Sequence, residues 1–257
     1  MVIGNATYSV RDYLRSGEMD LLDFPAFCAG LGLMALEYND MFFARWDDDY
    51  LDDVVISAAD AGCTIQCLTC GGNLASDDAA ANREQVELCR VRLEQAAALG
   101  APVVRFNIGS TGDEQRDLTD GVERVINGFS ALLPTARELG VKITIENHGG
   151  VSKYANPILE IVLSTDPEWV GTCPDFGNFH GDDMYLQLAK VIPFSYHLHA
   201  KFHEFDANGE DTGYSIERVL HLCKASGTQS VLAIEFEGSG EQKEGVRKSR
   251  DLMLRYL

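Results

Sequence analysis

The sequence predicts an α/β fold, a single (β/α)8 TIM barrel that includes residues 1–257. Eight apolar segments of strand length alternate with segments of helical periodicity, which is typical of a barrel of about 250 residues. No glycine-rich GxGxxG motif follows the first predicted strand, which disfavours a dinucleotide-binding fold. An open, doubly wound sheet is the alternative that the same alternation allows.

The eight predicted strands are short apolar segments separated by helical stretches. They are residues 3–8, 34–38, 64–69, 103–108, 142–147, 170–174, 196–201 and 231–236. Two helical faces are clear between them: one holds Val86, Cys89, Leu93, Ala96 and Ala97, and the other holds Val122, Val125, Ile126, Phe129, Leu132, Leu133 and Ala136. We expect Pro134 to kink the second helix. The glycines expected to end helices are Gly62, Gly100, Gly140 and Gly227.

Composition narrows the classes of function. The chain has 40 acidic and 21 basic residues and a formal charge of −19, which disfavours a nucleic-acid partner because that affinity depends on Lys and Arg. No apolar run is long enough to span a membrane. The N-terminus lacks a signal-peptide pattern, and the seven cysteines are an odd number, typical of reduced thiols. We therefore expect a cytoplasmic protein, with Cys67 and Cys70 as buried thiols.

Polar side chains occupy the carboxyl ends of four consecutive predicted strands. They are Glu146, Asp175, Glu235 and the pair His197 and His199. The carboxyl ends of barrel strands meet at one mouth, where active sites of this fold lie. Clustered carboxylates repel one another unless a cation joins them. The sequence therefore predicts one divalent metal ion, and this ligand type is compatible with Mn²⁺, Mg²⁺, Co²⁺ or Zn²⁺.

Four motifs carry a resemblance to a known family. They are Ile145-Glu146-Asn147-His148-Gly149-Gly150, Pro174-Asp175-Phe176-Gly177-Asn178-Phe179, His199-Ala200-Lys201 and Ile234-Glu235-Phe236-Glu237-Gly238. In this order they resemble the xylose-isomerase-like TIM barrel superfamily and, within it, the sugar phosphate isomerase/epimerase family. The resemblance implies a metal ion held by Glu146, Asp175, His199 and Glu235. It also implies that Glu146 and Glu235 act as acid and base on opposite faces of a sugar.

Two positions depart from the ketose epimerases of this family. Those enzymes have a substrate-binding His three residues after the metal Asp and an Arg six residues after the metal His; here the positions hold Asn178 and Phe205. Other polar residues near strand ends are therefore candidates for these roles. His148 is a catalytic candidate, and the substrate-binding candidates are Lys201, Asn178, Glu37, Arg105 and Asn107. The roles of His197, His180 and His203 stay open.

The expected function is that of a metal-dependent sugar isomerase or epimerase, which moves a proton next to a carbonyl through a metal-stabilised enediolate. A metal-dependent lyase or dehydratase acting on a keto-sugar or keto-inositol is the alternative, because it begins with the same proton abstraction. An abasic-DNA nuclease is disfavoured by the acidic charge, and a non-catalytic sugar-binding module does not need three carboxylates around a metal. The expected partner is a small carbohydrate, with no nucleic acid and no membrane, and the family adds the expectation of a homo-oligomer.

Overall fold

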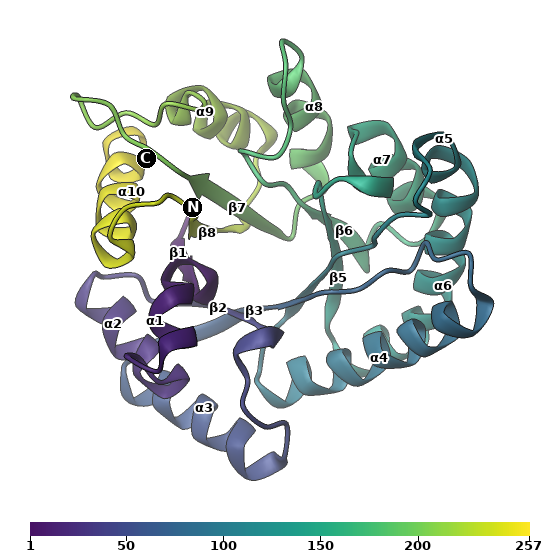
Figure 1. Ribbon diagram of the computed structural model, residues 1–257, viewed down its shortest axis with the longest axis horizontal. Helices are drawn as coiled ribbons and strands as arrows, with labels where there is room; N and C mark the ends of the chain where they lie inside the picture. Colours follow the sequence, from purple (N-terminus) through teal and green to yellow (C-terminus); the bar gives the residue numbers. More distant parts are fainter.

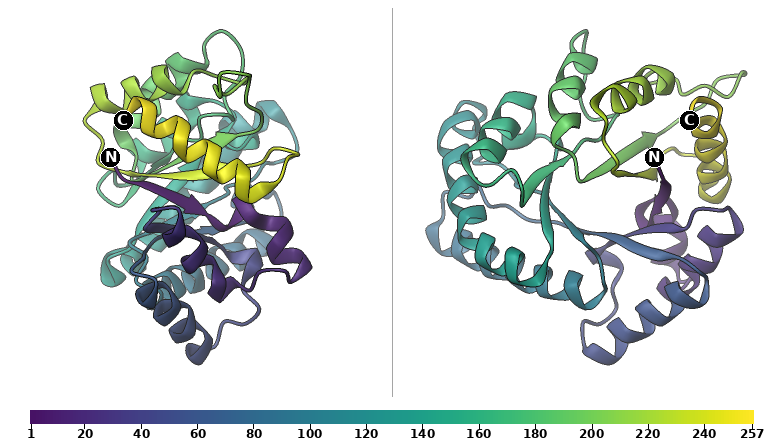
Figure 2. Two further views of the ribbon diagram at one scale, coloured as in Figure 1. Left: turned by 90° about the vertical axis from the view of Figure 1, so that its left-hand side faces the viewer. Right: turned by 180° about the vertical axis from the view of Figure 1, so that it is seen from behind.

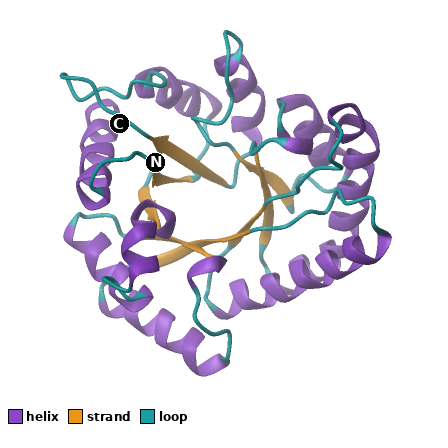
Figure 3. Cartoon of the chain, viewed as in Figure 1, coloured by secondary structure: helices purple, strands orange, loops and turns teal.

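Eight parallel strands form the centre of the computed structural model, which describes residues 1–257 (Figure 1, Figure 3). The strands are β1 (Ile3–Ala6), β2 (Ala35–Asn39), β3 (Thr64–Cys70), β4 (Val103–Phe106), β5 (Lys142–Glu146), β6 (Val170–Cys173), β7 (His197–Phe202) and β8 (Val231–Phe236). Each of the eight predicted strands is present, with ends within two residues of the prediction.

The strands close into a barrel. Their hydrogen-bonded order is β6-β5-β4-β3-β2-β1-β8-β7. Strands β6 and β7, at the two ends of this order, meet through parallel bridges between Thr172 and Ser195 and between Asp175 and His199. The predicted (β/α)8 barrel is therefore confirmed, and the open doubly wound alternative is wrong.

Helices surround the barrel on its outer side (Figure 1, Figure 2). They are α1 (Arg11–Ser16), α2 (Phe24–Gly30), α3 (Asp48–Asp60), α4 (Ala79–Ala98), α5 (Glu114–Arg116), α6 (Val122–Leu139), α7 (Ala155–Ser164), α8 (Met184–Val191), α9 (Ile216–Ser226) and α10 (Gln242–Tyr256). The two chain termini lie near each other, because β1 and α10 are neighbours around β8 (Figure 2). No helix combines the length and apolar composition that a membrane span requires.

The predicted helical faces are the faces that pack on the barrel. Cys89, Leu93 and Ala96 of α4 are buried, as are Val122, Val125, Phe129, Leu132 and Ala136 of α6. Helix α6 continues through Pro134 to Leu139. Gly140 and Gly227 are left-handed C-caps with φ of 70° and 74°, a conformation that costs glycine little. Gly62 and Gly100 follow α3 and α4 with φ of 71° and 69°.

The strands separate an apolar outer layer from a polar interior. Ile143, Ile145, Leu232 and Ile234 are part of the apolar cluster that strands and helices share. The residues that alternate with them point to the barrel axis, because successive side chains of a strand face opposite ways. These inner residues include Thr144, Glu146, Ala233 and Glu235, which are all buried. All seven cysteines are free and buried, as predicted for Cys67 and Cys70.

A Gly245→Ala substitution tests the packing of α10 on β8. Alanine is normally favoured over glycine inside a helix by about 1 kcal/mol. At Gly245, however, an added Cβ would overlap the ring of Phe236, and overpacking of a core costs about 1–3 kcal/mol. We expect the variant to have a lower free energy of unfolding in urea denaturation.

The matched control is Gly30→Ala in α2, where an added Cβ meets no atom within 4 Å. This variant should be as stable as the unsubstituted protein or slightly more stable. Equal stabilisation by both substitutions would contradict the close packing of α10 on Phe236.

Candidate metal centre

Four side chains converge at the carboxyl end of the barrel. Glu146 is the last residue of β5, Asp175 follows β6 by two residues, His199 lies in β7 and Glu235 lies in β8. Each offers one ligand atom, and these atoms all lie within 4.8 Å of one another. His199 Nδ1 is 2.8 Å from Glu146 Oε1 and 3.8 Å from Glu235 Oε2. The structure thus brings together the four residues that the sequence suggested as metal ligands.

Asp175 is held by the backbone and by Asn147. The amide N–H of Asp175 donates to Asn147 Oδ1 at 2.7 Å, and Asn147 Nδ2 donates to the Asp175 carbonyl at 3.0 Å. The N–H of Gly177 donates to Asp175 Oδ1 at 2.7 Å. The Asn147 bonds hold the backbone of Asp175, and the Gly177 bond occupies one carboxylate oxygen while the other, Oδ2, faces the cluster. The loop after β6 therefore fixes the orientation of this carboxylate.

Lys201 is the principal cation of the cluster. Its Nζ lies 3.0 Å from Asp175 Oδ2, 3.3 Å from Glu235 Oε2 and 3.0 Å from Glu237 Oε1. It also donates to Asn178 Oδ1 at 3.1 Å. Burial lowers the pKa of Lys201, but the carboxylates outweigh burial, led by Asp175, and the pKa is raised. Lys201 therefore stays charged and partly neutralises three acidic side chains.

Arg105 and His199 stabilise the ionised form of Glu146. Arg105, in β4, lies 3.4 Å from Glu146 Oε2 and donates to Asn107 Oδ1 at 2.7 Å. Burial raises the pKa of Glu146, but Arg105 and then His199 outweigh it and hold the pKa well below its ordinary value. Burial, with the charges of Glu146 and Glu235, raises the pKa of Asp175 well above its ordinary value despite Lys201. The two carboxylates thus differ in proton affinity although they share one site.

A cavity of about 370 Å³ opens above this cluster. Tyr8 and Met41 are the hydrophobic residues of its wall, and the other lining residues are polar or glycine. Seven of the residues singled out in the sequence line it: Arg105, Asn107, Glu146, His148, Asn178, Lys201 and Glu235. Small-molecule pockets are usually lined mainly by apolar side chains, so this wall offers unusually many hydrogen-bonding groups to a polar ligand.

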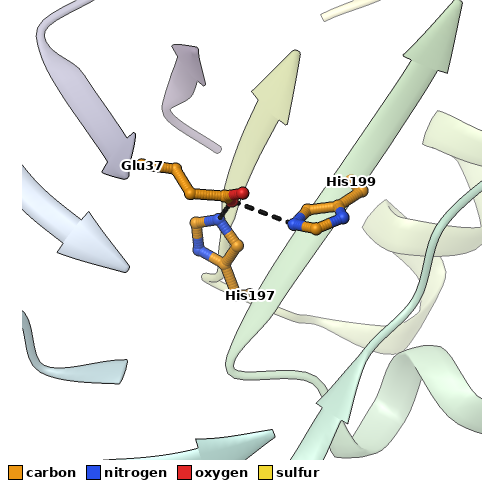
Figure 4. Close-up of side chains that lie close together, drawn as sticks. All are labelled: Glu37, His197 and His199. Carbon is orange, nitrogen blue, oxygen red and sulfur yellow. Dashed lines mark hydrogen bonds and ion pairs between the residues drawn. The ribbon is translucent and has the colours of Figure 1, made fainter. Parts of the chain in front are cut away.

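Glu37, also a substrate-binding candidate, lies below the cavity and does not line it. It is fully buried in β2, and its carboxylate faces His197 and His199 of β7 (Figure 4). Burial raises the pKa of Glu37, but His199 and His197 outweigh burial and lower it. The Glu37 carboxylate therefore contacts buried protein side chains and not the cavity.

The histidines after the strand ends and Phe205, which stands where the ketose epimerases have Arg, lie in different parts of the structure. His148 lines the central cavity and two adjoining cavities, and His180 lines one of the latter. His203 lines a separate cavity beside Phe205. The Phe205 ring stacks at 5.8 Å on Phe202 and at 6.4 Å on Phe236. It therefore belongs to an aromatic cluster and not to the wall of the central cavity.

Several residues of the site were missed in the sequence. Thr69, Asn39, Asp40 and Glu237 also line the cavity. Glu237 had a usable signal, because it follows Glu235 by two residues and therefore points to the same side. Asp40 directly follows the end of β2, and no neighbouring site residue in the sequence indicated that it would face the cavity.

The cluster fits a divalent cation. The buried oxygens Glu146 Oε2 and Asp175 Oδ2 make no hydrogen bond and have only ion-pair contacts, with Arg105 at 3.4 Å and Lys201 at 3.0 Å, although buried oxygens usually accept a hydrogen bond. Together with Glu37 and Glu237, the site holds five carboxylates against two permanent cations, Lys201 and Arg105. Carboxylate oxygens with one imidazole are ligands of Mn²⁺, Mg²⁺, Co²⁺ and Zn²⁺.

Comparisons with solved structures agree on the fold. D-psicose 3-epimerase from Clostridium cellulolyticum has 15% identity and a TM-score of 0.75, with 93% of this chain and 94% of that chain covered. L-ribulose 3-epimerase has 16% identity and a TM-score of 0.81, with 100% and 95% covered. The IOLI protein with a bound zinc atom has 17% identity and a TM-score of 0.78, with 100% and 99% covered. At these identities the likeness establishes the fold alone.

No curated protein matches the sequence. A family model described as the xylose isomerase-like TIM barrel matches residues 25–256. This match includes most of the chain and all four motifs that carried the resemblance in the sequence. The chain belongs to the xylose isomerase-like TIM barrel family.

Proposed function

We propose that the protein is a divalent-metal-dependent isomerase or epimerase of a small carbohydrate. The observation that carries this proposal is the set of Glu146, Asp175, His199 and Glu235, with ligand atoms within 4.8 Å of one another beneath a polar cavity. Two of the four, Glu146 and Glu235, also line that cavity and can contact a substrate. Sugar epimerases among the proteins of similar fold support the same reaction class.

The four side chains would hold one divalent ion, and the zinc of the IOLI protein supports an ion in a barrel of this type. When bound, the ion supplies positive charge beside a carbonyl oxygen, which makes the neighbouring C–H bond more acidic. Lys201, Arg105 and Asn107 offer hydrogen-bond donors and acceptors around the cavity. Asn178 Nδ2 is buried without a partner and is free to donate to a substrate hydroxyl.

Glu146 and Glu235 would perform the proton transfers. They come from β5 and β8, which are not adjacent in the barrel, so they approach a bound sugar from different sides. One carboxylate accepts the proton from the carbon next to the carbonyl, and the other carboxyl group returns a proton to the opposite face of that carbon. This exchange inverts the carbon and balances the protons. Isomerisation results instead when the proton is returned to the former carbonyl carbon and the hydroxyl proton of the deprotonated carbon moves to the former carbonyl oxygen.

A lyase or dehydratase acting on a keto-sugar or keto-inositol is the second candidate. It is favoured by Asn178 and Phe205, which stand where the ketose epimerases of the family carry His and Arg. Elimination starts with the same proton abstraction and then requires an acid for the departing hydroxyl, a role open to His148 at the cavity. Mass analysis of the product separates the two candidates, because isomers keep the mass of the substrate and dehydration removes one water.

The remaining predictions concern the setting of the protein. The seven free, buried cysteines support a cytoplasmic location. The polar cavity supports a small carbohydrate as partner. The absence of a nucleic-acid partner and the formation of a homo-oligomer stay predictions.

An Asp175→Asn substitution tests the metal site. The amide keeps the size of the side chain and its bond from Gly177 but removes the negative charge. We expect about one divalent ion per chain in the unsubstituted protein and a loss of at least about tenfold in metal affinity in the variant, measured by elemental mass spectrometry after dialysis against Mn²⁺ or Co²⁺.

The matched control is Asp117→Asn, at a buried carboxylate bonded to Ser110 and Thr111. This variant should keep its metal. An unsubstituted protein that takes up no ion from either metal would remove the basis of the proposal.

Glu146→Gln and Glu235→Gln test the two-carboxylate mechanism. A neutral amide cannot accept the proton, so interconversion of ketose epimers should fall by about 10²–10⁴-fold in each variant. The remaining carboxylate should still exchange the C–H of one epimer with D₂O. The two variants should therefore retain exchange with opposite epimers, as measured by NMR at matched metal content.

The control is Glu138→Gln on the exposed face of α6, which should leave both rates unchanged. Full turnover by either active-site variant, or exchange of the same epimer by both, would contradict the assignment of acid and base.

A further inference from the structure

Glu37 lies at the bottom of the candidate metal site, where no substrate can reach it. Its side chain has no exposed surface and does not line the central cavity. It extends from β2 across the barrel to β7, so residues 160 positions apart in the chain meet there (Figure 4). A buried charge is tolerated only when its partners satisfy it, so the hydrogen bonds of this carboxylate define its role.

Three groups surround the Glu37 carboxylate. His197 Nε2 lies 2.7 Å and His199 Nε2 lies 2.9 Å from Oε2, and Thr69 Oγ1 donates to Oε1 at 2.8 Å. The two imidazole rings are perpendicular, with centroids 5.7 Å apart. Both carboxylate oxygens are thus in use, and Glu37 cannot rotate without losing hydrogen bonds. His197 and Thr69 therefore anchor the carboxylate that His199 contacts.

The contact with Glu37 determines which nitrogen of His199 would keep its proton when a metal ion binds. An ionised carboxylate only accepts hydrogen bonds, so the contact from Nε2 requires an N–H there. Without an ion, Nδ1 donates in the same way to the Glu146 carboxylate, 2.8 Å away. An ion held by the four candidate ligands would replace the proton on Nδ1, while the contact with Glu37 keeps the proton on Nε2. A hydrogen bond from the distal nitrogen to a carboxylate orients metal-binding histidines in this way.

The same three residues, Glu37, His197 and His199, have an arrangement that could also hold an ion of their own. The distances of 2.7 and 2.9 Å between nitrogen and oxygen are those of hydrogen bonds. Thr69 already occupies the second carboxylate oxygen, and neither Glu37 nor His197 borders the central cavity. Hydrogen bonding is therefore favoured over a second metal site.

We propose that Glu37, anchored by His197 and Thr69, is a positioning residue that presents Nδ1 of His199 to the metal ion. This inference rests on the metal site of the proposed function, and it gives Glu37 a role other than the substrate contact that the sequence suggested. Removal of such an outer partner typically weakens metal binding by about 10–100-fold.

A Glu37→Gln substitution tests this inference in the full-length protein. The glutamine amide can turn either its NH₂ group or its oxygen toward His199. The NH₂ group cannot accept the bond from Nε2, and the neutral oxygen accepts a weaker bond than a carboxylate does. We expect Co²⁺ to bind about 10–100-fold more weakly, measured by competition with a chelator. We also expect a change in the visible absorption of bound Co²⁺, which reports ligand geometry. Melting of the metal-free protein records the effect on the fold separately.

Thr69→Val is the second variant and serves if Glu37→Gln does not fold. It removes only the hydroxyl that anchors Glu37, and Co²⁺ affinity should fall by at least about threefold. Its matched control is Thr172→Val, which removes a buried hydroxyl that donates to the Val191 carbonyl at 2.8 Å. The control should bind Co²⁺ like the unsubstituted protein.

Three results would overturn the inference. The first is unchanged Co²⁺ affinity and absorption in folded Glu37→Gln, including the case in which only the metal-free protein melts earlier. The second is two ions per unsubstituted chain with one lost in Glu37→Gln, because Glu37 would then be a ligand. The third is an unsubstituted protein that binds no Co²⁺, which would overturn the proposed function as well and is recognised from that sample alone.

Discussion

The burial of several carboxylates at one end of the barrel is the constraint on which the rest of the site depends. An ionised carboxylate is costly to bury unless cations or hydrogen-bond donors surround it. Lys201 approaches Asp175, Glu235 and Glu237 within 3.3 Å, and Arg105 approaches Glu146. These two side chains leave part of the negative charge unbalanced, and a further cation would stabilise the arrangement. Because such a cation would bind the folded chain, its binding energy would add to the stability of the fold.

The barrel creates this concentration of charge through strand register. In β7 and β8, His199 pairs with Ala233 and Lys201 pairs with Glu235, so the inner side chains of the two strands form successive layers. Barrel interiors are commonly filled by branched apolar side chains. Here small inner residues such as Ala233 and Cys173 leave space that larger polar side chains use. The helices pack on the opposite face of each strand, so the polar interior does not disturb the apolar layer.

The sequence predicted the fold and the strand ends that carry the candidate ligands, because both depend on local properties. The choice of His199 over His197 came from the resemblance to the family. Strand ends and the alternation of side chains are short-range properties, and consecutive strands are neighbours in a barrel. The contact between Glu37 and His197 depends on the barrel's radius and on which side chains cross its axis, and no spacing in the sequence encodes these. Phe205 illustrates the same limit, because its stacking on Phe202 and Phe236 places it outside the cavity. The cavity wall likewise forms only when the barrel closes between β6 and β7, where Asp175 and His199 are bridged.

The division between a buried layer and a rim explains why the ligand set alone does not determine the reaction. Glu37 and His199 lie within strands and are fully buried, whereas His148, Asn178 and Glu237 lie just beyond strand ends and face the cavity. Abstraction of a proton next to a carbonyl is common to isomerases, epimerases and dehydratases. These reactions differ in where the next proton goes and whether a hydroxyl departs, and in the proposed function the groups on the rim would contact those parts of a substrate. Asn178 in place of a histidine changes the rim without altering the ligand set. In the proposed function, the buried strand residues, together with Asp175 after β6, would hold the ion, and the loops after β5, β6 and β8 would determine which reaction follows.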